Sequence, residues 1–166
     1  SMRIRSWIVR LLFLSACLAS NSASAVVSYV ASTSVAPTGN NTSMAVSLPA
    51  GVQAGDLLLA QIAIDGDVTV NTPVGWTLLQ VDSNSMVQAL YYRFATASET
   101  GNVTWTWSSN RRAAGGIALY RGVDPSQVPG PVAVDSDDDD DLEAPAQTVT
   151  VANSLLVTLY GLNRGN

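Results

Sequence analysis

The carboxylates of this chain are concentrated in one stretch, DSDDDDDLEAP at residues 135–145, which holds six aspartates and one glutamate. Calcium is the cation that such a stretch could bind through alternating aspartates, and these are Asp135, Asp137, Asp139 and Asp141. An EF-hand loop that starts at Asp135 is excluded, because Asp140 stands where the turn requires glycine and Ala146 where a bidentate glutamate should close the shell. Adjacent aspartates repel one another, so we expect a solvated loop. Calcium binding through backbone carbonyls and water is the alternative, and no other cofactor is expected.

The residues that usually perform acid–base and nucleophilic catalysis are scarce in this chain. It has no histidine and no lysine, and its single cysteine is Cys17. Serine, cysteine and zinc hydrolases would therefore lack their usual catalytic partners or ligands. Two carboxylate pairs, Asp65 with Asp67 and Asp56 with Glu99, could in principle flank a glycosidic bond. Aspartates beside glycine more often cap turns, so we expect no enzyme activity and rank a carboxylate-based glycoside hydrolase as the weakest alternative.

Aromatic side chains are the other residues that could bind a ligand, because sugar rings stack on exposed aromatic faces. Trp105 and Trp107 alternate with polar residues in NVTWTWSS, which predicts that both belong to the core. Trp76 lies in a Gly-Trp turn and is expected to plug one end of the fold. Tyr91 and Arg93 share one face of a strand, and we expect that face to point outward. Trp76, Tyr91 and Arg93 are therefore the candidate ligand-binding residues, and for Tyr91 and Arg93 the favoured alternative is a solvated surface without a ligand.

The charge balance limits which partners the chain can attract. It has 8 arginines against 13 aspartates and glutamates, a net charge of −5. Arg3, Arg5 and Arg10 lie in the first ten residues, so the rest of the chain is more acidic still. Because an acidic surface repels phosphate groups, we expect no nucleic-acid partner.

The first 25 residues have the pattern of an export signal. After Ser1, which we interpret as a cloning remnant, MRIRSWIVR is cationic, LLFLSACLA is apolar and SNSASA ends in a small-x-small cleavage site before Val26. The alternative is lipoprotein processing at Cys17, because LSAC resembles a lipobox. The apolar run is too short to cross a bilayer, so we expect a secreted or cell-surface protein without a transmembrane span.

Downstream of the signal, residues 26–166 consist of short apolar segments separated by turn residues such as Gly, Pro, Asn and Asp. The predicted strands are at 26–34, 42–48, 56–65, 76–82, 87–95, 102–108, 113–121, 146–151 and 154–162. Many short strands at regular spacing predict one all-β domain, an antiparallel β-sandwich of the jelly-roll or Ig-like type.

The predicted interior of this domain is apolar, with no polar network. Its expected members are Leu58, Ile62, Leu79, Leu90, Tyr92, Trp105, Trp107, Ile117, Leu119, Leu156 and Val157. If closing strands are missing, the strand at 154–162 or its neighbour leaves backbone groups unpaired, and the chain is expected to self-associate.

The runs LPAGVQAGDLLLAQIAIDG, TPVGWTLL, ALYYRFATASE, GGIALYRGVDPS and TVANSLLVTLYG resemble a domain that recurs in large secreted bacterial proteins and in some phage-associated proteins, where its function is unassigned. The resemblance covers about residues 42–166 and rests on structural motifs. In that family the pattern continues past the last strand, which implies that this sandwich is incomplete at its C-terminus. The acidic run is not part of the family pattern.

Two functions follow as expectations. The resemblance and the sandwich imply a non-catalytic module for binding or adhesion at the cell surface, with an extracellular glycan or a surface protein as its ligand. The alternative is a structural extracellular subunit that assembles through exposed strand edges.

Overall fold

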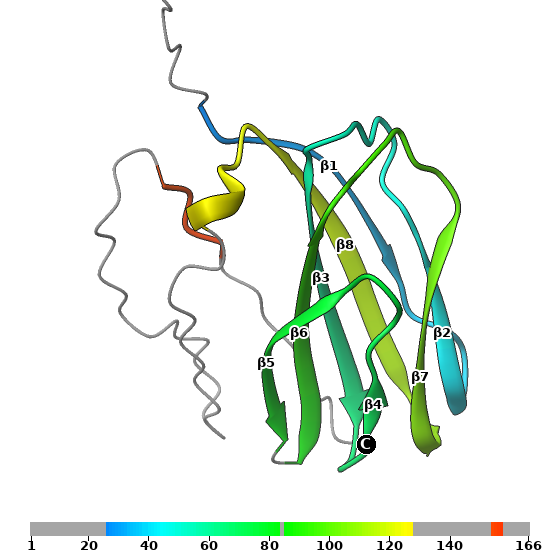
Figure 1. The fold of residues 1–166 in the computed structure, drawn as a ribbon. Helices are drawn as coiled ribbons and strands as arrows, with labels where there is room; N and C mark the ends of the chain where they lie inside the picture. The colour runs from blue at the N-terminus through cyan, green and yellow to red at the C-terminus, as the bar shows by residue number, and fades with distance from the viewer. Residues whose placement is uncertain (1–25, 84, 128–153, 158–166) are drawn as a thin grey trace, which may run out of the picture.

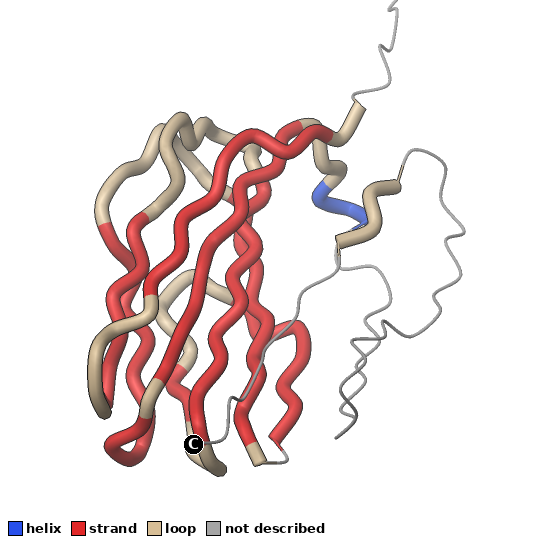
Figure 2. The backbone as a smooth tube through the Cα atoms, turned by 180° about the vertical axis from the view of Figure 1, so that it is seen from behind, coloured by secondary structure: helices blue, strands red, loops and turns tan. Residues whose placement is uncertain are grey.

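The computed structural model describes residues 26–83, 85–127 and 154–157, and their backbone is mostly extended (Figures 1 and 2). The strands are β1 Ser28–Val35, β2 Asn41–Ser47, β3 Leu57–Asp65, β4 Val70–Asn71, β5 Thr77–Ser83, β6 Met86–Phe94, β7 Asn102–Arg111 and β8 Ala113–Arg121. One short 3₁₀ turn, Pro125–Gln127, follows β8. All of these strands except the two-residue β4 correspond to segments predicted from the sequence. The expected signal at 1–25 and the acidic run lie outside the described residues.

The strands form two antiparallel sheets that face each other, which confirms the predicted all-β sandwich (Figure 1). The larger sheet has the order β1-β8-β3-β6-β5, and the smaller has the order β2-β7-β4. The pairs β1/β8, β2/β7 and β3/β6 are nested in sequence, as in a jelly roll. β3 pairs with β6 on one side and with β8 on the other, so the LLLAQIAID segment occupies the centre of its sheet.

The core lies between the two sheets and is built from apolar side chains. Six predicted members are confirmed as buried there: Leu58, Ile62, Trp105, Trp107, Ile117 and Leu119. Leu79 is only half-buried. Asp56 is the single charged residue that is buried among the described residues.

The predicted orientation of β6 is wrong. Tyr91 is 1% exposed and faces the core with Val87 and Ala89, whereas Leu90 and Tyr92 are half-buried on the opposite face of the sheet. Both faces of this strand carry apolar residues, so alternation alone does not identify the inward face.

The predicted strand at 154–162 is also wrong over the part that the structure describes. Residues 154–157 are not in a strand, and Leu156 is 65% exposed, so it does not belong to the core. Val157 is half-buried and lies outside the core cluster. The predicted strand at 146–151 lies outside the described residues.

Candidate functional site

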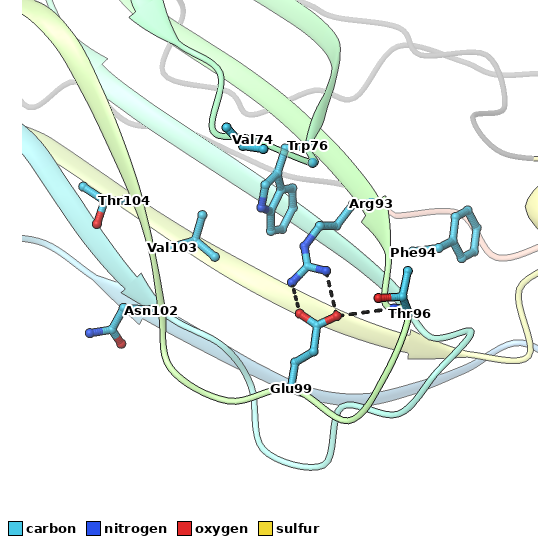
Figure 3. Close-up of a pocket in the computed structure, with 10 residues that line it drawn as sticks. Val74, Trp76, Arg93, Phe94, Thr96, Glu99, Asn102, Val103 and Thr104 are labelled. Carbon is cyan, nitrogen blue, oxygen red and sulfur yellow. Dashed lines mark hydrogen bonds and ion pairs between the residues drawn. The ribbon is translucent and has the colours of Figure 1, made fainter.

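An open pocket of about 540 Å³ lies where the chain leaves β4 and passes into β5 (Figure 3). Its lining comes from the β4–β5 turn, the end of β6, the β6–β7 loop and the start of β7. The lining residues are Val74, Gly75, Trp76, Arg93, Phe94, Thr96, Glu99, Asn102, Val103 and Thr104. The volume falls within the range of about 300–1,000 Å³ that is usual for ligand pockets.

The turn between β4 and β5 forms one wall of the pocket. The Trp76 N–H donates to the Pro73 carbonyl at 3.2 Å, and Gly75 between them has a φ of 83°, which favours glycine. This turn gives the apolar side chains on either side of Gly75 opposite environments. Val74 is fully exposed at the rim, and Trp76 is only 7% exposed.

Arg93 lies between Trp76 and Glu99 (Figure 3). Its guanidinium carbon is 5.3 Å from the centroid of the Trp76 ring, within the range of a cation–π contact. Arg93 Nη1 donates to Glu99 Oε1 at 2.9 Å, and Nη2 donates to Oε2. The Arg93 hydrogen bonds hold the pKa of Glu99 below its usual range. Glu99 is therefore stabilised as an anion and is poorly suited to act as a general acid.

Trp76 belongs to a cluster of aromatic rings that extends into the core. Its ring centroid is 5.3 Å from that of Trp105, and the Tyr91 ring is 5.9 Å from Trp105. Burial raises the pKa of the Tyr91 hydroxyl. Of the three predicted ligand-binding residues, Trp76 and Arg93 line the pocket together, whereas Tyr91 lies beneath it in the core and was wrongly expected to face outward.

The carboxylate pairs considered for catalysis are not arranged as pairs of free acids. Asp56 accepts two hydrogen bonds from Arg121, at 2.8 and 2.7 Å, and one from the Gln53 N–H at 2.9 Å. Glu99 is held by Arg93 at the pocket. Asp65 and Asp67 are exposed around the turn that follows β3. Asp56 therefore serves as an anchor for the start of β3 against the end of β8.

The predicted calcium ligands Asp135, Asp137, Asp139 and Asp141 lie outside the described residues. Among the residues that are described, no group of three or more His, Cys, Asp or Glu side chains is arranged to hold a metal ion. Within the same residues, no helix has the length and apolar character needed to cross a membrane.

Searches for related proteins found no matching family model, curated protein or solved structure.

Several pocket residues were not predicted from the sequence, chiefly Val74, Thr96, Asn102 and Thr104. A local signal was Pro73, because proline ends a strand that would otherwise continue along β7. Polar residues on a strand surface are normally solvated, so Asn102 and Thr104 carried no signal of their own.

Proposed function

We propose that this protein is a secreted, non-catalytic β-sandwich module for binding or adhesion at the cell surface, and that its ligand site is the pocket beside Trp76 and Arg93. The observation that carries this proposal is the wall formed by the β4–β5 turn. A fully exposed valine, Val74, stands at the rim of an open pocket lined by both apolar and polar residues. An isolated exposed valine needs no explanation, but one at the mouth of a pocket gives a ligand apolar surface to cover.

A binding role fits the chemistry of the pocket better than catalysis does. Glu99, which is the carboxylate among the described residues that line the pocket, is bound to Arg93, and Arg93 is also stacked over Trp76. Proton transfer needs a group whose pKa lies near the working pH, and Glu99 is shifted away from that range. The ion pair instead provides a rigid, electrically neutral wall.

A surface protein is the ligand class that we favour over a glycan. The glycan expectation depended on an aromatic face open to a sugar ring, and Trp76 is only 7% exposed beneath Arg93. The side chains of Asn102 and Thr104 point away from Trp76 and Arg93 (Figure 3), so these two residues border the pocket with their backbone, which suits hydrogen bonding to another backbone.

The test compares two variants that carry the same substitution at exposed valines. Val74→Glu places a charge at the pocket rim, and Val26→Glu places one at a residue that is 76% exposed and does not line the pocket. Fluorescently labelled protein is applied to an array of purified extracellular proteins and to an array of oligosaccharides. We expect binding to a protein that Val74→Glu abolishes and Val26→Glu preserves. Equal binding by the wild type and Val74→Glu would contradict the proposed site, and binding to oligosaccharides alone would reverse the ligand class.

A self-assembling extracellular subunit is the second candidate function, because two edge strands lack the charged residues and prolines that usually protect a sheet edge, although Thr33 of β1 donates a hydrogen bond to the Ser47 carbonyl of β2. β1, SYVASTSV, and β2, NTSMAVS, each lie at the edge of a sheet and contain no charged residue and no proline. Light scattering over a range of concentrations tests this function. Ala45→Lys, an exposed position on β2, should then reduce the apparent mass, and a wild-type protein that stays monomeric would exclude it.

A further inference from the structure

Among the described residues, the backbone of β7 is paired along only part of the edge that faces β4. The Ser108 N–H donates to the Thr69 carbonyl, on the β4 side, at 3.1 Å. At the other end, the Gly101 carbonyl accepts from the Leu48 N–H, on the β2 side, at 2.8 Å. Because successive residues of a strand direct their backbone groups to opposite edges, Asn102 and Thr104 direct theirs toward the β4 side, like Ser108.

β4 does not reach these two residues. It pairs with β7 at Val70↔Trp107 and Asn71↔Thr106, and the same register would place Pro73 opposite Thr104. Proline has no N–H, so it cannot donate to the ladder, and the chain turns away toward Trp76. Among the described residues, no strand faces this part of the edge. The backbone N–H and C=O groups of Asn102 and Thr104 therefore border the pocket.

We propose that the ligand of this pocket is an extended peptide segment that adds to the edge of β7 at residues 102–104 and continues the β4–β7 ladder. This inference rests on the proposed binding function and specifies the chemistry of the partner. The two residues offer two donors and two acceptors, spaced about 6.8 Å apart along the strand. Residues i and i+2 of an extended chain present the complementary set at the same spacing, as in other cases of strand addition.

The pocket also selects the side chain at the centre of this segment. A residue directly across from Val103 projects to the same face of the sheet as Val103, which is half-buried against the core. Trp76 lies on that side and Val74 stands at the rim, while Arg93 and Glu99 neutralise each other. The central side chain is therefore apolar and uncharged, with charged residues excluded by the cost of desolvating them.

The experiment uses a displayed library of random seven-residue peptides selected against the immobilised protein. Enriched peptides are then synthesised in three forms: one unmodified, and two with N-methyl groups at alternate backbone nitrogens, one for each of the two alternating registers. N-methylation removes hydrogen-bond donors and leaves every side chain in place. We expect enriched peptides with a central apolar residue, amide chemical-shift changes at Asn102 and Thr104, and binding that weakens about tenfold or more for one N-methylated register.

Two substitutions at one position provide the matched protein variants. Thr104→Pro removes an N–H that faces the pocket and not β2, so the β2–β7 ladder keeps its bonds, whereas Thr104→Val keeps the backbone donor. We expect about a tenfold loss of peptide affinity for Thr104→Pro and little change for Thr104→Val. Circular dichroism checks the fold of both variants, and if Thr104→Pro does not fold, the N-methylated peptides decide the question.

Failure of this inference is distinguishable from failure of the proposed function. A library without enrichment, or peptides that bind equally well in both N-methylated registers and to Thr104→Pro, would overturn strand addition. The array experiment with Val74→Glu is independent of backbone pairing. Binding there that depends on Val74 would preserve the proposed function, with recognition through side chains alone.

Discussion

The buried carboxylate of Asp56 should contribute measurably to stability. Asp56 is 2% exposed and joins the turn before β3 to Arg121 at the end of β8. In the Asp56→Asn variant, the charge is lost and one carboxylate oxygen is replaced by an NH₂ group that faces the guanidinium or the Gln53 N–H. A hydrogen bond to a charged group contributes about 1.5–3 kcal/mol, and removing one partner of a fully buried ion pair costs about 3–5 kcal/mol.

The smaller range, about 1.5–3 kcal/mol for a hydrogen bond to a charged group, applies to Asp56. The Arg121 side chain is 39% exposed, so water solvates the guanidinium once its partner is gone. We expect Asp56→Asn to lower the free energy of unfolding by about 2 kcal/mol at pH 7, measured by urea denaturation. Asp67→Asn makes the same chemical change at an exposed position and should leave the midpoint unchanged.

The dependence on pH gives a second readout of the same interaction. Hydrogen bonding to Arg121 lowers the pKa of Asp56 from the ordinary value of 3.8. A group whose pKa is lowered by folding stabilises the protein above its ordinary pKa, and this contribution is lost as the pH falls through the folded-state value. The difference in stability between the wild type and Asp56→Asn should therefore shrink below about pH 4. A difference that stays constant from pH 7 to pH 3, or no difference at all, would refute the assigned role.

Three further predictions concern the core, the sheet and the acidic run. Trp105→Ala should lower the free energy of unfolding by about 3–5 kcal/mol in urea denaturation, since this side chain is 0% exposed; an unchanged midpoint would place it at the surface. Gly116→Ala should lower the free energy of unfolding by about 1–3 kcal/mol and speed amide hydrogen exchange in β1, because the added Cβ would lie 2.6 Å from the Thr33 carbonyl oxygen. Unchanged exchange would show that β1 moves aside without strain. Calcium titration by calorimetry should detect no saturable site with a midpoint below about 1 mM, and a site abolished by combining Asp139→Asn with Asp141→Asn would contradict the solvated loop.

The strands were predictable because their boundaries depend on local chemistry. Turn residues separate the apolar segments, and β8 was located with its bounds unchanged, Ala113–Arg121. A strand that is apolar on both faces is typical of the middle of a sheet, and β3 has both this pattern and this position. Pairing across the two sheets depends on contacts between distant residues, so the sequence allowed both jelly-roll and Ig-like orders.

The site was predictable only in part, and the reason lies in β6. Tyr91 and Arg93 do share a face, as expected, but that face points into the sandwich. Arg93 stands at the end of this inward row, where its guanidinium leaves the core and pairs with Glu99 in the following loop. A long side chain near a strand end can follow the buried row and still bring its charge to the surface. Strand periodicity alone does not indicate this, so the ion pair was missed.

Pro73 explains why the pocket is confined to a short part of β7. An ordinary residue at that position could donate to the β7 ladder and extend β4, whereas proline ends the pairing after Asn71. The turn that follows places Val74 at the rim and Trp76 against the core. Pro73 therefore ends the pairing of β4 with β7 within the described part of the chain, and it also begins the turn that forms one wall of the pocket. The unpaired part is bounded by β4 at one end and by the loop carrying Glu99 at the other, so it suits a short extended segment.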